Sequence, residues 1–559
     1  MPPRFFKKPN KLVVKPTVNS TKPIAKQPIP SSIFVPTEQY LETVRLSAYL
    51  GKKGYTIPKS ILLAEDYRYL KNAMYMKPVV MGQPQEDGAF SVYRENDAKI
   101  YLPRFYGIKR YGLPCKSEIQ VGDDIDIEFT GELRDYQHNI INTYLDYVEK
   151  PICNGADTFG GGGILEVPCG RGKTIMALNI ISRVGSQINK KGSGKKTIIL
   201  VHKEFLMNQW IERISDFLPS ARVGKIQANK LEIEGKDIVI GMIQTLFTRD
   251  FPANTFDSFG LLIIDEVHHI GSEMFSRTLL KIVTPYVLGI SATVERKDKL
   301  TKVLYMFIGD KIYSEERKQD DAVTVHGIYY KTADESFNET EYDFKGQPKY
   351  STMISKLCEY GPRSDFIVKV LTDLIGLYGE KGQVMILSHN RSLLSYLYKA
   401  IEHRKICSVG FYVGGMKEKD LKDTEEKKVV LATYSMAAEA LDIKTLSMLI
   451  MASPKKDIEQ SVGRILRVKH DNPIVVDIVD SHQLFQNQWQ VRKRFYKKCN
   501  YGILSIESGN YKGMAVDNGW NRVYNHVSCS INESESSDSD KEKEESINKT
   551  SRLANYIKI

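Results

Sequence analysis

The stretch that decides the fold is Glu166-Val167-Pro168-Cys169-Gly170-Arg171-Gly172-Lys173-Thr174. An apolar segment, Gly163 to Leu165, precedes it, and a helical segment beginning Ile175-Met176-Ala177-Leu178 follows it. A glycine-rich loop between a strand and a helix is the setting of a P-loop, where backbone amides and the helix N-terminus bind phosphates. We expect Lys173 to reach the β- and γ-phosphates of a nucleoside triphosphate and Thr174 to ligate its Mg²⁺.

The loop as a whole is expected to hold the nucleotide. Its expected contact residues are Pro168, Cys169, Gly170, Arg171, Gly172, Lys173 and Thr174. One position departs from the general pattern GxxxxGK[ST], because Val167 stands where the first glycine belongs. A glycine turn followed by a chance Lys-Thr is the alternative interpretation, and the other motifs have to decide between the two.

A pair of carboxylates forms the second motif, Leu262-Ile263-Ile264-Asp265-Glu266-Val267-His268-His269. An apolar strand brings adjacent acids to its carboxyl end. Asp265 is expected to hold the Mg²⁺ of the nucleotide, and Glu266 to orient and deprotonate the attacking water. An acidic pair after a strand is moderate evidence alone, and strong evidence with a P-loop upstream.

Two arginines mark the third motif, Gln460-Ser461-Val462-Gly463-Arg464-Ile465-Leu466-Arg467. Side chains three residues apart share a helix face, so Arg464 and Arg467 are expected to point the same way. From a second domain they could reach a γ-phosphate as arginine fingers. The alternative is a solvated helix face, which is what Arg-x-x-Arg usually forms.

The fold class is α/β, because short continuous apolar runs alternate with helical stretches in two successive blocks. The expected strands are 197–202, 237–241 and 261–265 in the first block, and 384–388, 429–433, 448–452 and 474–478 in the second. Open sheets of this kind bind ligands at the carboxyl ends of their strands, so two in tandem imply a site in the cleft between them.

The expected domain organisation has five parts. They are a disordered basic arm (1–32), a small N-terminal accessory domain (33–125), the ATP-binding domain (126–318), a second α/β domain (319–500) and a C-terminal extension with an acidic, serine-rich tail (501–559). The segment from Tyr101 to Ile108 is rich in aromatic and basic residues. It is expected to be a strand or loop, and an aromatic core strand is favoured over a base-stacking surface.

Composition sets limits on the class of protein. The net charge of +11 is compatible with a polyanionic partner or with plain solubility, and does not decide between them. Seven cysteines without a CxxC pair argue against zinc ribbons and disulfide frameworks. We find no signal peptide and no membrane-length apolar run, so a soluble intracellular protein is expected, with no membrane partner.

Taken in order, these motifs resemble those of the superfamily 2 helicases over roughly residues 130 to 480, which implies two tandem RecA-like domains that use ATP and Mg²⁺. The resemblance implies an adenine contact for Gln137 and a ribose contact for Asp442. It implies nucleic acid contacts for Gln244, Thr245, Ser388 and Thr433, and a role in coupling hydrolysis to movement for His268, Ser291, Thr293 and Gln460.

Within that superfamily, the run Ser291 to Asp298 followed by Phe307-Ile308-Gly309 is similar to the XPB and UvsW branch and to helicases of large DNA viruses, including the poxvirus transcript-release helicase. The resemblance implies movement on nucleic acid, DNA rather than RNA, with 3′-to-5′ polarity. Transcript release, repair or replication are the implied processes, and RNA polymerase or transcription factors the implied protein partners. If the chain is viral, host cytoplasm or nucleus and the virion are the implied locations.

Two alternatives to a strand-separating helicase stay open at this stage. One is a translocase or transcription-complex remodeller that moves on duplex without unwinding it. The other is a helicase-like scaffold that binds nucleic acid and has lost hydrolysis, which the presence of Lys173, Asp265, Glu266, Arg464 and Arg467 argues against.

Overall fold

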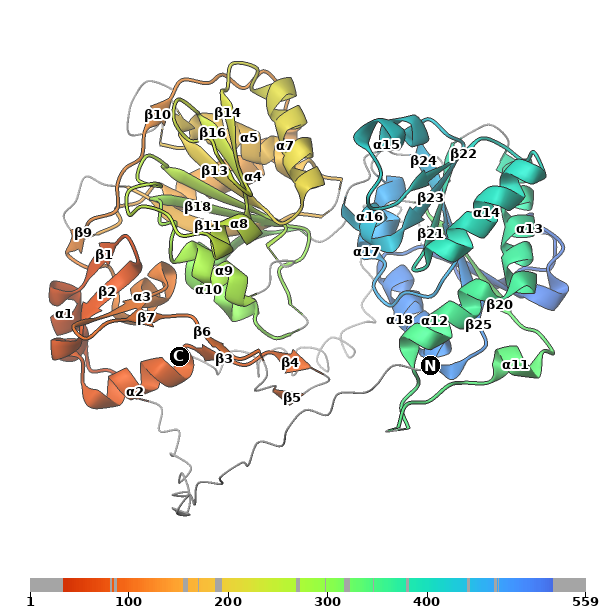
Figure 1. Ribbon diagram of the computed structural model, residues 1–559, viewed down its shortest axis with the longest axis horizontal. Helices are drawn as coiled ribbons and strands as arrows, with labels where there is room; N and C mark the ends of the chain where they lie inside the picture. Colours follow the sequence, from red (N-terminus) through yellow and green to blue (C-terminus); the bar gives the residue numbers. More distant parts are fainter. Residues whose placement is uncertain are drawn as a thin grey trace, which may run out of the picture.

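The computed structural model describes residues 34–80, 83–84, 88–153, 159–168, 170–185, 194–267, 272–296, 298–315, 322–344, 346–378, 382–439, 443–466, 470 and 472–525. Two lobes, each built on an eight-stranded sheet, stand side by side, and a smaller N-terminal unit lies against the first lobe (Figure 1). Within these ranges, the helices are all too short or too polar to cross a membrane.

The sheet of the first lobe has the strand order β15-β14-β16-β13-β17-β18-β11-β19. These strands are β15 (Lys230–Leu231), β14 (Val223–Gln227), β16 (Ile238–Met242), β13 (Thr197–Val201), β17 (Leu261–Asp265), β18 (Tyr286–Ser291), β11 (Gly161–Glu166) and β19 (Lys311–Ser314). All neighbours pair in parallel except β14 and β15. The central strands are buried along their whole length, as continuous apolar runs require, because helices cover both faces.

Helices of the first lobe connect its parallel strands. They are α4 (Asp135–Val148), α5 (Lys173–Arg183), α7 (Glu204–Phe217), α8 (Ile243–Thr248), α9 (Ser272–Leu279) and α10 (Thr301–Ile308). The three strands expected from this part of the sequence are confirmed as β13, β16 and β17, with ends shifted by at most one residue. A separate two-stranded ladder joins β10 (Asp124–Ile125) to β12 (Gly194–Lys195), which directly precedes β13.

The second lobe repeats the plan with the order β22-β23-β21-β24-β25-β20-β26-β27. These strands are β22 (Val409–Tyr412), β23 (Val429–Thr433), β21 (Gln383–Ser388), β24 (Leu446–Met451), β25 (Ile474–Asp480), β20 (Thr324–Tyr330), β26 (Gly502–Glu507) and β27 (Asn521–Tyr524). All four expected strands are present. The sheet extends past the expected boundary at residue 500, because β26 pairs with β20 in its interior.

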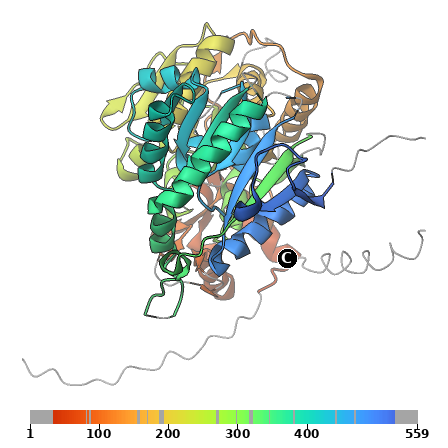
Figure 2. The same cartoon turned by 90° about the vertical axis from the view of Figure 1, so that its right-hand side faces the viewer.

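Helices of the second lobe pack on both faces of its sheet. They are α11 (Glu335–Asn338), α12 (Tyr350–Glu359), α13 (Gly361–Tyr378), α14 (Arg391–His403), α15 (Glu418–Glu425), α16 (Tyr434–Glu439), α17 (Glu459–Gly463), the 3₁₀ turn η3 (Arg464–Leu466) and α18 (Gln483–Lys498). Figure 2 shows the green helices of this set in front of the blue strands of the sheet. The two sheets bear out the expected tandem α/β fold.

The N-terminal unit is a five-stranded sheet of order β7-β8-β2-β1-β9 with three helices. Its elements are α1 (Glu38–Ser47), β1 (Tyr49–Gly51), β2 (Gly54–Pro58), η1 (Lys59–Ile61), α2 (Ala64–Ala73), β7 (Arg94–Glu95), β8 (Lys99–Leu102), α3 (Arg104–Tyr111) and β9 (Lys116–Ser117). Short ladders join β3 (Tyr75–Met76) to β6 (Phe90–Ser91) and β4 (Val79–Val80) to β5 (Gln83–Pro84).

The expectation of a strand or loop over Tyr101 to Ile108 is wrong for its second half. Strand β8 ends at Leu102, Pro103 caps the next element, and α3 begins at Arg104. Proline suits a helix start because the first helical turn needs no donor there. The helix then fixes the unit to the first lobe, since the buried Arg104 guanidinium donates to the carbonyls of Thr284 (3.0 Å) and Pro285 (2.8 Å).

Candidate nucleotide-binding site

The P-loop runs from the end of β11 to the start of α5. Gly170 and Gly172 have φ values of 83° and 78°, in the left-handed region that glycine adopts without strain. A Cβ on Gly172 would also lie 2.4 Å from Gln137 Nε2. Both glycines are therefore required by geometry, and Lys173 and Thr174 follow in the first turn of α5.

Val167, which replaces the first glycine of the general pattern, extends the strand. Its amide donates to the carbonyl of Ser291 at 2.9 Å, and its side chain is fully buried in the core of the first lobe. A side chain fits at Val167 because its backbone continues the hydrogen bonding of the sheet, and the turn that surrounds the phosphate begins only after this residue. The departure therefore leaves the phosphate-binding part of the loop intact.

The two sequence-distant motifs meet at the carboxyl edge of the sheet. Lys173 Nζ lies 3.7 Å from Glu266 Oε1, and both side chains are largely shielded from solvent. Glu266 has φ 47°, a left-handed value that is unusual for a side chain of this type. The turn gives Glu266 and Asp265 different directions, and the Glu266 amide donates to Asp265 Oδ1 at 2.9 Å.

Asp265 is buried, and the indole of Trp210 donates to its Oδ2 at 2.9 Å. Burial, with the charge of Glu266 beside it, raises the pKa of Asp265 to about 6, although Trp210 and Lys173 lower it. A buried carboxylate in this position is suited to a divalent cation, which would compensate the unfavourable charge. The donor set of the Thr174 hydroxyl and the Asp265 carboxylate is the oxygen chemistry that Mg²⁺ prefers.

Gln137 lies directly on the P-loop. Its Oε1 accepts from the Arg134 amide at 2.9 Å, and its Nε2 donates to the carbonyl of Arg171 at 3.0 Å. The hydroxyl of Tyr136 donates to the same carbonyl at 3.2 Å. These contacts bring the start of α4 to the nucleotide loop.

Arg171 is held away from the loop interior by two partners. Its guanidinium lies 3.7 Å from the centre of the Tyr136 ring and makes a two-point ion pair with Glu315, at 2.5 and 3.3 Å. Glu315 follows β19, where the chain leaves the first lobe. The loop is thereby tied to the segment that leads to the second lobe.

Glu166 is a site residue that sequence reasoning missed. Its carboxylate accepts from the Val294 amide (2.8 Å), Lys311 (2.7 Å) and the Ser314 hydroxyl (2.6 Å). Burial opposes the charge, but these three donors lower the pKa of Glu166 below its usual range. The strand that leads into the P-loop is thus joined to the Ser291–Val294 turn. A glutamate at a strand end gave no signal for this role.

Ser291 and Thr293, expected to couple hydrolysis to movement, lie on that turn. The buried Ser291 hydroxyl donates to the carbonyl of Thr293 at 2.6 Å. Because β18 lies between β11 and β17, the turn lies next to both the P-loop and the acidic pair.

The second lobe presents α17 and η3 on the side that faces the first lobe (Figure 1). Gln460 lies on α17 and is partly exposed, whereas Arg464 begins η3 and is buried. Burial and Glu425 raise the pKa of Tyr412, and the nearby charge of Arg464 opposes that rise. In this arrangement the Arg464 side chain is buried within the second lobe.

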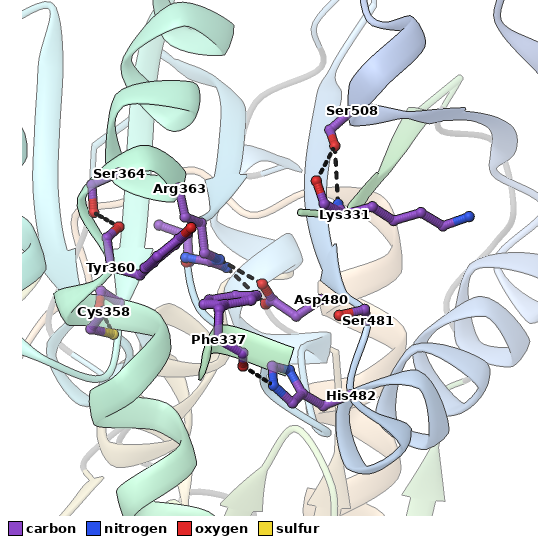
Figure 3. Close-up of polar contacts among 12 residues, drawn as sticks. Lys331, Phe337, Cys358, Tyr360, Arg363, Ser364, Asp480, Ser481, His482 and Ser508 are labelled. Atoms are coloured by element: carbon purple, nitrogen blue, oxygen red, sulfur yellow. Dashed lines mark hydrogen bonds and ion pairs between the residues drawn. The ribbon is translucent and has the colours of Figure 1, made fainter. Parts of the chain in front are cut away.

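Two fully buried arginines hold the loop that precedes α17. Arg363 makes a two-point ion pair with Asp480 (2.6 and 2.8 Å) and donates to the carbonyl of Ala452 at 2.8 Å (Figure 3). Arg492 pairs in the same way with Asp477 (2.7 and 2.8 Å) and donates to the carbonyl of Lys455 at 2.9 Å. Both pairs fix the path from β24 to Arg464.

The residues expected to contact nucleic acid lie on α8, directly after β16, in the first lobe and at the ends of β21 and β23 in the second. Gln244 is exposed on α8 and donates to the carbonyl of His202 at 2.8 Å, and Thr245 accepts from the Ala228 amide at 3.0 Å. Thr433 ends β23 and is partly exposed. Ser388 is different: it is fully buried against Cys358 and accepts from the Asn390 amide at 3.1 Å. Burial contradicts a direct contact by its hydroxyl, which instead shapes the turn after β21.

Four expected site residues lie outside the described residues. They are Cys169, His268, Asp442 and Arg467. The same holds for the basic arm and the acidic tail.

Comparisons with known proteins show which family this chain belongs to. The family model "Type III restriction enzyme, res subunit" matches residues 130–296. The "Putative ATP-dependent RNA helicase L396" of Acanthamoeba polyphaga mimivirus is 32% identical over 80% of this chain and 85% of its own. The "Putative ATP-dependent RNA helicase QP509L" of African swine fever virus is 26% identical over 73% and 78%, and the "Putative helicase 161L" of Invertebrate iridescent virus 6 is 26% identical over 69% and 85%.

Among solved structures, S. cerevisiae Dbp5 bound to RNA and ADP BeF3 aligns with 68% of this chain and 91% of its own, at 14% identity and a TM-score of 0.46. The mimivirus relative, similar over most of both chains, identifies the family. The chain belongs to the superfamily 2 helicases, which are ATP-dependent enzymes. Within them it lies with the helicases of large DNA viruses.

Proposed function

We propose that this chain hydrolyses ATP at the P-loop and uses the energy to move along nucleic acid. The observation that supports this most directly is the approach of Lys173 to Glu266, at 3.7 Å, beside the buried Asp265. A phosphate-binding cation, a metal-binding carboxylate and a candidate base meet at one point. A scaffold that had lost hydrolysis would have no need of all three.

Each residue has a role that follows from its position. The loop amides and Lys173 bind the phosphates, and Gln137 lies at the base-binding end of the loop. Thr174 and Asp265 would hold Mg²⁺, which neutralises charge on the phosphates when bound. Glu266 orients and deprotonates the attacking water. Arg464, with Arg467, completes the site when the lobes close, as an arginine finger does.

The ATPase assay of Lys173→Ala tests this proposal. Without the lysine, no cation of the loop binds the γ-phosphate, so we expect phosphate release to fall to background. The affinity for nucleic acid should stay within about threefold of wild type. Lys302→Ala is the matched control, because Lys302 is an exposed lysine on α10 of the same lobe. Wild-type turnover in Lys173→Ala would overturn the assignment.

The nucleic acid substrate is a separate part of the proposal. DNA and 3′-to-5′ movement are the expectation from the branch resemblance, whereas the mimivirus and swine fever virus relatives are named as RNA helicases. Phosphate contacts from Gln244, Thr245 and Thr433 would position either strand without reading bases. We propose comparing ATPase stimulation by single-stranded DNA, duplex DNA, RNA and an RNA–DNA hybrid, beside a strand-displacement assay that separates unwinding from translocation.

A further inference from the structure

One face of the N-terminal sheet presents a row of side chains that crosses all five strands. The strand register aligns Arg94 with Tyr101, Tyr101 with Thr56, Thr56 with Tyr49, and Tyr49 with Lys116. Residues that are paired across strands point to the same face of a sheet. Tyr101 and Tyr49 are therefore about two strand spacings apart, about 10 Å, with only the small Thr56 between them.

The opposite face of this sheet is the one that the helices cover. The ring of Tyr55, in the alternate position on β2, is stacked on Tyr111 of α3 at 6.0 Å, and a Cβ on Gly107 of α3 would lie 2.2 Å from it. The buried Asp66 of α2 accepts from the hydroxyls of Tyr40 on α1 and Tyr111 on α3. The three helices are thus bound together behind the sheet, and the row of Tyr49 and Tyr101 lies on the other side.

Lysines surround the two rings. Lys99 Nζ lies 5.1 Å from the centre of the Tyr49 ring and donates to its hydroxyl at 3.0 Å. Lys53 lies 5.0 Å from the centre of the Tyr101 ring, and Lys116 lies 5.9 Å from that of Tyr49. Glu118, 3.1 Å from Lys116, offsets part of this charge. We call this set, Tyr49, Tyr101, Lys53, Lys99 and Lys116, the tyrosine face.

We propose that the tyrosine face binds the unpaired bases of a single nucleic acid strand, an inference that rests on the proposed function. Flat aromatic rings flanked by lysines are the two elements that single-strand surfaces combine, because rings stack on bases and cations follow the phosphates. A stacked base contributes more than an exposed lysine–ring pair, so a base displaces the lysines from the rings toward phosphates. A duplex hides its base faces and does not offer this contact.

The position of the tyrosine face relative to the first lobe supports the same partner. Arg104 anchors the unit to the lobe, and Arg94, at the edge of the row, donates to the carbonyl of Arg277 on α9 at 3.4 Å. Helix α9 packs against α8, which carries Gln244 and Thr245. A strand held at α8 therefore has a basic path, through Arg277 and Arg94, to the tyrosine face.

Fluorescence anisotropy at one fixed salt concentration tests this inference, with labelled oligo-dT, oligo-U and a blunt DNA duplex as probes. We expect the double variant Tyr49→Leu/Tyr101→Leu to raise the Kd for both single strands about 10- to 100-fold, with the duplex Kd within about threefold. Tyr49→Phe/Tyr101→Phe keeps the rings and should bind single strands within about threefold of wild type. Tyr75→Leu, an exposed tyrosine outside this sheet, is the matched control.

Photocrosslinking of the wild-type chain to a strand containing 5-bromouracil covers the case in which the leucine variant does not fold. Crosslinks to the peptides of Tyr49 or Tyr101 support the inference. The inference is overturned by crosslinks confined to the two lobes, or by wild-type binding of the leucine variant. Equal weakening of the leucine and phenylalanine variants would also overturn it, because that result would point to a hydroxyl contact with a protein or other partner. Failure of the proposed function gives a different result, because the ATPase activity of the wild-type chain is then not stimulated by any nucleic acid.

Discussion

At Asp265 the requirements of the fold and of the chemistry oppose each other. The carboxylate is buried beside Glu266, and its pKa is raised to about 6 from an ordinary value of 3.8. In the nucleotide-free protein the native state therefore binds more protons than the unfolded chain between about pH 4 and pH 6. The free energy of unfolding therefore falls as pH rises through this window. Above about pH 6 the folded protein carries the full energetic cost of the buried, ionised carboxylate.

Asp265→Asn tests this opposition. We expect the variant to lose hydrolysis but to be more stable than wild type at pH 7.5, by about 1–3 kcal/mol, with the difference vanishing near pH 4. Urea unfolding followed by tryptophan fluorescence measures it. Trp210, of the three tryptophans in the chain, contacts Asp265 directly.

A second aspartate provides a control of opposite sign. Burial of Asp237 is outweighed by its ion pair with Arg222, at 2.6 Å, and its pKa is lowered. Asp237→Asn should therefore destabilise the protein at pH 7.5. If Asp265→Asn were also destabilising there, the account of a strained carboxylate would be wrong.

At the scale of elements, β11 is packed more closely than a strand with ordinary side chains allows. Added Cβ atoms would lie 2.1 Å from the Ile308 carbonyl at Gly162, and 2.8 Å from Ile312 at Gly163. At Gly162, Phe105 of α3 is also only 2.4 Å away. The glycines before the P-loop thus let α10 and the N-terminal unit approach the strand, in addition to any role in the loop.

Gly162→Ala is expected to destabilise the protein by about 1–3 kcal/mol, because backbone atoms cannot yield as a flexible side chain would. The matched control is Gly376→Ala in α13, where a Cβ meets no atom within 4 Å. That change should stabilise the protein by about 0.5–1 kcal/mol through helix propensity. Thermal unfolding of both variants measures the difference, and equal effects would refute the packing argument.

Helices and strands can be predicted from the sequence where a single local pattern of residues determines the structure. Strand β17 matches its expected bounds because four consecutive apolar residues, Leu261 to Ile264, are buried and lead directly to Asp265. The glycines of the P-loop follow from local backbone requirements in the same way. Trp210 and Glu166 were not predictable, because they reach the site through contacts between residues far apart in sequence, and tryptophan and glutamate carry no distinctive spacing. The start of α3 is not evident from the sequence, because Pro103 directly follows the extended residues of β8 and is compatible with a loop as well as with a helix start.

At the scale of the molecule, α7 of the first lobe and α15 of the second lie on the sides of the two lobes that face each other (Figure 1). The charge of Glu212 on α7 contributes to raising the pKa of Glu425 on α15, after the larger effect of burial. A nucleotide that attracts the arginine-bearing segment η3 would favour closer approach of the two lobes, so closure is expected to depend on the nucleotide.

Arg464 is the residue through which such closure would reach the chemistry. It is buried in the second lobe near Tyr412, on a loop fixed by the Arg363–Asp480 and Arg492–Asp477 pairs, so the whole lobe has to move for Arg464 to meet a γ-phosphate. We expect Arg464→Ala to lower nucleic acid-stimulated kcat by a factor of about 10³ or more, with ATP affinity changed by less than about threefold.

The control for Arg464→Ala is Arg404→Ala, which removes an exposed ion pair with Asp365 in the same lobe and should leave kcat within about twofold. Because Arg464 is buried, urea unfolding of both variants must accompany the kinetics, and an Arg464→Lys variant separates charge from shape. A finger needs the planar fork of arginine, so lysine should rescue stability without rescuing kcat. Turnover of Arg464→Ala near that of wild type, in a folded protein, would show that the second lobe does not complete the site through this residue.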